Sequence, residues 1–158
     1  MIVRRFQTED AEAVSALISR TLRTTNSQDY SPREIEAVER SLGPEQVIQR
    51  SKWTHFYVVC QEDTIIGCGA VGPYWGKQDE CSFFNIFVLP EYQGRGVGRK
   101  IIETLEQDPY FLRSKRAEIP ASLTACGFYL KLGYTYKNGI TTPDEEQLYR
   151  LEKHRKLA

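Results

Sequence analysis

The hydrophobic positions of this chain follow two spacings in turn, which predicts an α/β protein. Val14, Leu17, Ile18 and Leu22 recur at the three- and four-residue spacing of one helix face, whereas short apolar runs such as 81–88 are typical of buried strands. Strands are expected at 2–6, 56–60, 65–71, 81–88, 117–120, 134–137 and 148–153, and helices at 8–22, 31–42, 44–50, 98–107 and 124–132. This order favours one mixed sheet flanked by helices.

Capping and turn residues mark several boundaries. Thr8 is expected to cap the first helix, and Ser-Pro-Arg-Glu at 31–34 forms a capping box with proline at the first helical position. Residues 72–80 are expected to form a loop. The chain from about His154 is expected to fray, as chain ends often do.

The stretch from Asn85 to Gly98 carries the clearest indication of chemistry. An apolar strand-like run meets Pro90, three glycines follow at alternate positions, and a helical pattern begins at once. Glycines let the backbone approach an anion closely, and the first amides of a helix are unpaired, where the helix dipole favours negative charge. Arg95 and Arg99 add positive charge beside them. The segment therefore predicts a phosphate-binding loop.

Three kinds of glycine loop compete for this segment. The NTPase loop ends in Gly-Lys-Ser/Thr, but Gly98 is followed by two basic residues, which leaves no hydroxyl for Mg²⁺. The dinucleotide fingerprint needs its third glycine three positions after its second, but Gly98 follows Gly96 by two. The remaining pattern is Gln-x-x-Gly-x-Gly at 93–98, preceded by an aliphatic-Val-x-Pro-like run at 87–90. Together these resemble the pyrophosphate-binding loop of the GNAT superfamily of acyl-CoA-dependent N-acyltransferases.

The resemblance implies how the donor, acetyl-CoA, would be bound. In this family the central strand splays from its neighbour near the loop, which leaves backbone amides free for the cofactor. Pro90 fits such a break because proline cannot donate to a strand ladder. A backbone amide of 86–88 is expected to polarise the thioester carbonyl. The residues expected to contact acetyl-CoA here are Ile86, Phe87, Val88, Gln93, Gly94, Arg95, Gly96, Val97, Gly98 and Arg99.

A second motif lies at 125–134. It resembles the family's Ala-x-x-Phe-Tyr-x-Lys-x-Gly-Phe/Tyr segment, in which the tyrosine commonly donates a proton to the departing thiolate. This role carries over to Tyr129, with a packing role as the alternative. Many members have an asparagine seven residues earlier, where this chain has Ser122. Ser122 is expected either to bond the pantetheine arm or to cap the next helix.

Two carboxylates are candidates for the base that accepts the proton of the amine. Glu80 begins the central strand and Glu118 lies on the short fifth strand, both positions where family members place a base. Ala117 and Ile119 bracket Glu118, which is expected to raise its carboxyl pKa and favours it slightly. For both carboxylates, a solvated position at a strand end is the alternative.

Composition narrows the classes of function. The 158 residues suit one domain, 1–158, and 21 basic residues balance 21 acidic ones, which argues against a nucleic-acid or membrane-surface binder. None of the four cysteines forms Cys-x-x-Cys, and neither histidine has metal-ligand spacing, so no metal is expected. The cysteines fit a reducing compartment, and no leader or long apolar run is present, so a cytoplasmic protein is expected.

The leading hypothesis is an N-acetyltransferase that moves the acetyl group of acetyl-CoA to a primary amine by direct attack on the thioester. The alternatives are a catalytically inactive acyl-CoA-binding regulatory domain and an unrelated nucleotide-binding module. The acceptor remains open among small amines, amino acids and protein amines, and so does a homodimer.

The acceptor is expected between 24–53 and the loops 72–80 and 138–146. There, Tyr74 and Trp75 form a rim or cover the sheet edge, and the acidic run 144–146 attracts a cationic amine or is merely solvated.

Overall fold

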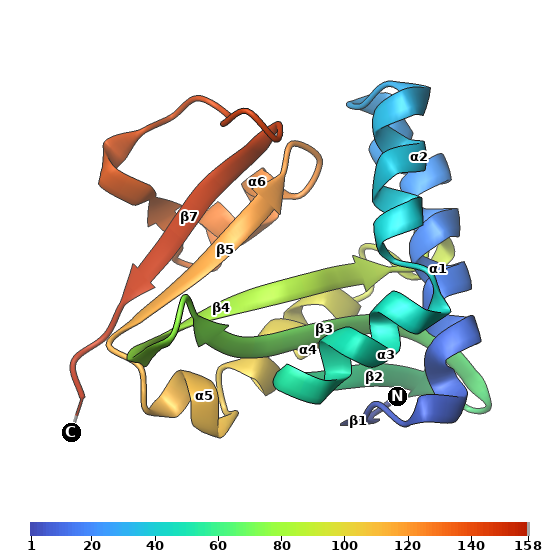
Figure 1. The fold of residues 1–158 in the computed structure, drawn as a ribbon, viewed down its shortest axis with the longest axis horizontal. Coiled ribbons are helices and arrows are strands. Elements are labelled where there is room, and N and C mark those ends of the chain that lie inside the picture. Colours follow the sequence, from blue (N-terminus) through green and yellow to red (C-terminus); the bar gives the residue numbers. More distant parts are fainter. Residues whose placement is uncertain (158) are drawn as a thin grey trace.

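One seven-stranded sheet organises the chain, and it is antiparallel except where β4 meets β5. The structure is a computed structural model and describes residues 1–157. The strand order is β1-β2-β3-β4-β5-β7-β6 (Figure 1). The strands are β1 (Ile2–Arg5), β2 (His55–Gln61), β3 (Thr64–Tyr74), β4 (Lys77–Val88), β5 (Arg116–Ser122), β6 (Thr135–Tyr136) and β7 (Leu148–His154). The predicted α/β fold with a mixed, mostly antiparallel sheet is confirmed.

Helices cover both faces of the sheet. They are α1 (Ala11–Thr24), α2 (Pro32–Ser41), α3 (Pro44–Trp53), α4 (Val97–Leu105), α5 (Pro109–Leu112) and α6 (Cys126–Lys131). Trp53 of α3 packs edge-on against Phe84 of β4, whereas Ile101 of α4 packs on Gly69 of β3 from the other face. None of the helices within 1–157 has the length and apolarity that crossing a membrane requires.

The predicted splay of the central strand is confirmed. β4 and β5 pair only from Glu80–Arg116 to Ser82–Glu118, and beyond that point β5 stays with β7 while β4 stays with β3. In Figure 1 the two strands part from this point like the arms of a V. The parting exposes the cleft-facing edge of β4 along its last residues.

A β-bulge shapes the free arm of β4. Asn85 has a φ of 54°, and the register with β3 shifts between Cys68 and Ala70. Asparagine is one of the few residues that adopt this left-handed conformation readily. The bulge re-aims the residues after it, and such re-aiming is a common use of bulges beside functional sites.

Helix α4 lies unusually close to β3 because two glycines face it. A Cβ at Gly67 would lie 3.1 Å from Cγ1 of Val97, and a Cβ at Gly69 would lie 2.6 Å from Cγ2 of Ile101. Ile101 and Leu105 are completely or almost completely buried, and each such burial contributes about 1.5–3 kcal/mol. This packing fixes the start of α4 at the end of β4.

The predicted loop at 72–80 is wrong. β3 continues to Tyr74, β4 begins at Lys77, and Trp75 and Gly76 make a tight turn with φ values of 46° and 74°. The polar residues of this stretch lie on strands because the hairpin pairs them locally. Backbone hydrogen bonds between β3 and β4 hold these strand ends together, so they need no alternation of apolar residues.

The two chain-end expectations also change. Thr8 lies within a 3-10 turn, and the first capping interaction is the bond from the Gln7 amide to the Asp10 carboxylate, at 2.8 Å. His154 closes β7 instead of fraying. The Arg155 guanidinium then donates to the carbonyls of Phe111 and Ser114, each at 2.9 Å. By contrast, the expected capping box at 31–34 is present.

Candidate active site

The glycine loop presents free amides at the start of α4. Gly94 and Gly96 have φ values of 75° and 84°, and Gly96 is the N-cap of the helix. The first helical hydrogen bond runs from the Lys100 amide to the Gly96 carbonyl, at 3.0 Å. The amides before Lys100 therefore have no partner within the helix, and they point where the helix dipole attracts an anion. A Cβ on either glycine would meet nothing within 4 Å, so backbone conformation, and not space, requires glycine here.

Gln93 braces the loop against the rest of the fold. Its side-chain amide donates to the Val88 carbonyl at 3.1 Å and to the Thr25 hydroxyl at 3.3 Å. The loop is thereby tied both to the end of β4 and to the end of α1. The glutamine of the motif thus has a structural task in addition to any contact with a ligand.

A cleft of about 930 Å³ lies between the parted strands and the loop. Ten of the residues predicted to contact donor or thiolate line it: Ile86, Phe87, Val88, Gln93, Gly94, Gly96, Gly98, Arg99, Ser122 and Tyr129. Four predicted residues do not line it. The Arg95 guanidinium lies over the Tyr92 ring, Val97 is buried in the core, and Glu80 and Glu118 belong to an ionic cluster around Arg116, which adjoins the cleft through Arg150.

Strand alternation decides which amides of β4 face this cleft. The Leu89 amide bonds the Ile66 carbonyl on the β3 side at 2.9 Å. Alternate residues of a strand point their amides to the same side, so the Phe87 amide also faces β3. The amides of Ile86 and Val88 face the side that β5 has left. Of the three residues predicted to polarise a carbonyl, these two have the required direction.

Tyr129 of α6 brings a buried phenol to the cleft. The residue is 4% exposed, lines the cleft, and makes no side-chain hydrogen bond to any residue within 1–157. Burial, and secondly the neighbouring Cys68 thiol, raise the pKa of Tyr129 above its ordinary value of 10. The hydroxyl therefore stays protonated through the neutral range and has no competing partner in this part of the protein.

Ser122 has the capping role that was one of its two predicted roles. Its side-chain oxygen accepts a hydrogen bond from the Ala125 amide at 3.1 Å, which caps the turn that leads into α6. Because a hydroxyl both accepts and donates, the proton of Ser122 remains available to the cleft that the residue lines.

The two candidate bases share one arginine. Arg116 Nε lies 2.8 Å from Glu80 Oε1, and its Nη1 lies 3.1 Å from Glu118 Oε1 and 2.9 Å from Glu152 Oε1. Lys137 Nζ is also 2.9 Å from Glu118 Oε1. Burial is the largest single influence on the pKa of Glu80 and raises it, but the hydrogen bonds and charges of Arg116 and Lys77 together outweigh burial, and the net shift is downward.

The expected apolar environment of Glu118 is wrong. Ala117 and Ile119 flank it in sequence, but successive strand residues point to opposite faces. The carboxylate instead shares its face with Arg116, and Lys137 and Arg150 also contact it, Arg150 at 3.7 Å. The sequence neighbours of a strand residue are therefore a poor guide to its electrostatic environment.

The cleft continues to the segments where the acceptor was expected. This end is lined by α2, α3, the β3–β4 turn, β4, and the chain before and within β7. The lining residues here include Ile35, Val38, Leu42, Arg50, Trp75, Phe84, Asn85, Glu146, Leu148 and Arg150. Asp144 of the predicted acidic run accepts hydrogen bonds from Arg150 Nε at 2.7 Å and from the Glu146 amide at 2.9 Å, so its carboxylate is committed to the loop.

Three of the lining residues that sequence reasoning did not single out shape the cleft most directly: Phe128, Arg50 and Asn85. Phe128 closes on the glycine loop, since a Cβ at Gly98 would lie 3.0 Å from its Cζ. Its place beside Tyr129 in the second motif was a signal for it. Arg50 and Asn85 lie in segments that the sequence had already indicated, but no residue pattern predicted their contact, which depends on the bulge.

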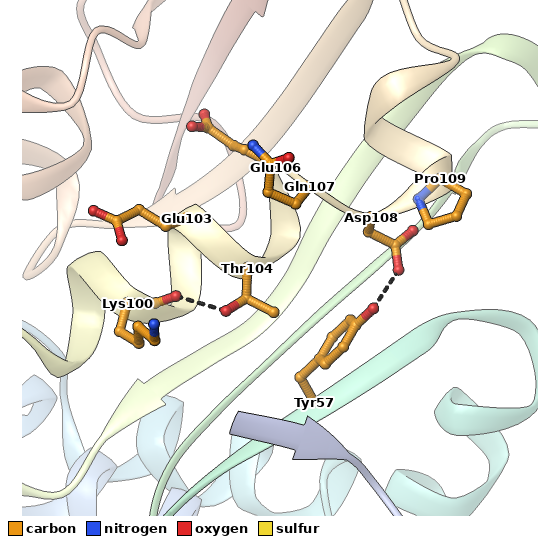
Figure 2. A pocket seen from close by; sticks show the side chains of 8 residues that line it. All are labelled: Tyr57, Lys100, Glu103, Thr104, Glu106, Gln107, Asp108 and Pro109. Atoms are coloured by element: carbon orange, nitrogen blue, oxygen red, sulfur yellow. Dashed lines mark hydrogen bonds between the residues drawn. The ribbon is translucent and has the colours of Figure 1, made fainter. Parts of the chain in front are cut away.

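A second hollow, of about 630 Å³, lies away from all of these residues, at the end of α4 (Figure 2). Figure 2 shows Tyr57 of β2 pointing at Asp108, whose carboxylate accepts its hydroxyl at 2.6 Å. Asp108 also caps α5 through the Tyr110 amide and contacts His55 Nδ1 at 2.7 Å. These polar groups satisfy one another, so the hollow has a structural explanation.

Comparisons with known proteins agree with this geometry. The family model of the acetyltransferase (GNAT) domain matches residues 52–136. The chain is 27% identical over 135 residues to the uncharacterized N-acetyltransferase YafP of Escherichia coli strain K12, covering 84% of this chain and 79% of that protein.

Two solved structures share the fold over nearly the whole chain. One is the PaiA N-acetyltransferase of Thermoplasma acidophilum in complex with coenzyme A, with a TM-score of 0.81, 19% identity, and coverage of 97% of this chain and 98% of that one. The other is a GCN5-related N-acetyltransferase from Rhodopseudomonas palustris, with a TM-score of 0.78, 21% identity, and coverage of 97% and 94%.

Proposed function

Because the chain belongs to the GNAT acetyltransferase family, we propose that it transfers the acetyl group of acetyl-CoA to a primary amine by direct attack on the thioester. One observation carries this proposal. A single cleft connects the free amides at the start of α4 with the phenol of Tyr129, which bonds no residue within 1–157, at the place where β4 leaves β5.

The cleft suits an acyl-CoA. Its loop end offers backbone amides and Arg99 to a pyrophosphate, and its middle offers the free edge of β4 to the amide groups of a pantetheine arm. The coenzyme A complex of the PaiA enzyme, which has the same fold, supports this choice of ligand. The residues proposed to contact the donor are those predicted ones that line the cleft, with Val97 contributing only its backbone.

The proposed reaction forms one bond and breaks one. The neutral amine nitrogen attacks the thioester carbon, the N–C bond forms, and the C–S bond breaks. The amides of Ile86 and Val88 face the developing negative charge on the carbonyl oxygen. Tyr129 gives its proton to the departing thiolate and regains one from solvent, and the nitrogen loses a proton to solvent or, through water, to a carboxylate.

Deprotonation of the amine is the costly step. A lysine-like amine has a pKa of about 10.4, which is about 3.4 units above pH 7. Removing its proton at pH 7 therefore costs about 4.6 kcal/mol. Since Glu80 and Glu118 do not line the cleft, either would receive the proton only through intervening water. If Glu118→Gln and Glu80→Gln both leave the pH–rate profile unchanged, neither carboxylate is the base.

The test measures binding and turnover separately. Acetyl-CoA at 100 times its Kd should stabilise the protein by about 2.7 kcal/mol, whereas ATP should not. Release of the coenzyme A thiol should then be followed with a panel of primary amines. Stabilisation by acetyl-CoA without turnover of any amine would favour the inactive regulatory domain, and stabilisation by ATP alone would favour the nucleotide-binding module.

A further inference from the structure

Arg50 is a cation without an acid at the acceptor end of the cleft. It lies in the last turn of α3, is partly buried, and lines the cleft. Its guanidinium lies 4.7 Å from the ring centre of Phe84 and 5.1 Å from that of Trp53. Among residues 1–157, no carboxylate lies within 4.0 Å of it, and burial alone lowers its pKa. A guanidinium removed from water without an anionic partner is costly, so its surroundings suit an incoming anion.

The other cation at this end, Arg150, is already paired, and the Glu34 carboxylate has a backbone partner. Arg150 contacts Asp144 at 2.7 Å and Glu146 at 3.6 Å. The Glu34 carboxylate accepts the Ser31 amide at 2.8 Å in the capping box of α2. Arg50 is therefore the one cation at this end whose charge the described residues leave uncompensated.

Asn85 turns this charge into a directional site. The Arg50 guanidinium can only donate, and it donates to the Asn85 side-chain oxygen at 3.0 Å. The amide nitrogen of Asn85 is then a second donor beside the guanidinium. Asn85 directly precedes Ile86, whose amide faces the cleft, so an anion held here lies next to the proposed reaction centre.

The remaining lining of this end is apolar. Ile35 and Leu42 are buried, Val38 is 37% exposed, and Trp75, in the β3–β4 turn, is 86% exposed. These side chains suit a small apolar group carried by the same molecule as the anion.

Resting on the proposed function, we propose that the acceptor is a free α-amino acid with an apolar side chain, whose carboxylate binds Arg50 and Asn85 while its amine attacks the thioester. In an α-amino acid, two bonds separate the nitrogen from the carboxylate carbon, so the two groups lie close together. The two protein groups that would face them are also close, because Asn85, which would bind the carboxylate, directly precedes Ile86, whose amide would bind the thioester carbonyl that the nitrogen attacks. A single guanidinium with one amide suits a singly charged carboxylate better than a dianionic phosphate. A lysine side chain within a protein has no carboxylate at this separation.

The test compares each amino acid with its own amide. Leucine, methionine and phenylalanine are assayed beside leucinamide, methioninamide and phenylalaninamide, and kcat/KM is expressed per neutral amine because the amides are less basic. The amino acids should be the better substrates. Arg50→Met should lower their kcat/KM roughly 10- to 150-fold, the range for a hydrogen bond to a charged group, and should change that of the amides less than about 3-fold.

Two controls separate binding of the carboxylate from other effects. Lys52→Met, two residues along the same helix and exposed, should retain the preference. Arg50→Met should keep the stabilisation by acetyl-CoA. Leucine should also raise the melting temperature of the wild-type protein with coenzyme A present, and this increase should disappear in Arg50→Met.

The outcomes distinguish this inference from the proposed function. Amides that are turned over as well as amino acids, or an Arg50→Met variant that loses both alike, would overturn the choice of acceptor while leaving acetyl transfer in place. If no amine is acetylated but leucine still binds through Arg50, the proposed function fails and the carboxylate site stands. If leucine neither binds nor reacts, the carboxylate site is refuted.

Discussion

The phenol of Tyr129 offers the sharpest test of the proposed chemistry, through Tyr129→Phe. The substitution removes one oxygen and keeps the ring that packs in the core. Because the hydroxyl bonds no residue within 1–157, no protein hydrogen bond is lost. The free energy of unfolding should therefore change by less than about 1 kcal/mol, or about 2–4 °C in melting temperature for a chain of this size. An effect on activity would then be an effect on chemistry.

The expected loss of activity follows from the acidity of the two groups. General acid catalysis typically contributes 10²- to 10⁴-fold. A thiol resembling cysteine has a pKa of about 8.5, so its thiolate is a good leaving group and needs a proton less than an alkoxide would. We therefore expect the low end of the range, a decrease of kcat/KM by roughly 100-fold, equivalent to about 2.7 kcal/mol in the barrier.

The dependence on pH checks the protonation state. A proton donor is active below its pKa, and burial raises the pKa of Tyr129 above 10. The ratio of wild-type to Tyr129→Phe activity should therefore stay constant from pH 6 to pH 10. Tyr149→Phe is the matched control, since Tyr149 lies outside the cleft lining. Full activity in Tyr129→Phe would refute the donor role, and a ratio that falls towards one between pH 8 and pH 10 would refute the raised pKa of Tyr129.

Three further substitutions test the loop, the ionic cluster and the first helix. Gly96→Glu places a carboxylate in the anion-binding loop and should abolish stabilisation by acetyl-CoA in thermal melts; Gly96→Ala, which shares the strain at a φ of 84° without the charge, should retain part of it. Glu118→Gln leaves Arg116 with one acid fewer and should cost about 3 kcal/mol, a fall of about 6–12 °C in melting temperature; an unchanged melt would contradict the cluster's role. The hydrogen bond from Arg4, opposed by burial, lowers the pKa of Asp10 below its ordinary value of 3.8. The ionised Asp10 therefore stabilises the fold fully above pH 3.8, and this stabilisation is lost as the pH falls through the lowered pKa. Asp10→Asn should therefore lower the melting temperature more at pH 6 than at pH 3, and an equal loss at both would argue against the pair.

The features that were predictable from sequence are those set by local chemistry. The loop at 93–98 requires glycine because of its backbone conformation, and the capping box at 31–34 satisfies amides within four residues. The pairing of the loop with Tyr129 came from the family resemblance, since the two motifs lie on different elements. Local rules hold where the partners of a group are its sequence neighbours.

The features that escaped prediction depend on partners distant in sequence. The hairpin at 72–80 has no alternation of apolar residues, because backbone hydrogen bonds between β3 and β4, and not burial of side chains, hold it together. Arg50 and Asn85 are 35 residues apart and meet only because the bulge turns Asn85 towards α3. No spacing within either segment indicates such a contact.

The ionic cluster around Arg116 has a consequence for the cleft itself. Arg116 lies on β5 and bonds Glu80 of β4 and Glu152 of β7, at the end where β4 and β5 still pair. The arginine therefore clamps the closed end of the V, and the bulge at Asn85 redirects β4 farther along its open arm. A site that needs free amides on the edge of β4 requires β4 and β5 to stay apart at one end and to stay paired at the other. Because Glu118 adds its charge to the clamp from within β5, its removal should loosen the closed end whether or not the carboxylate also receives a proton.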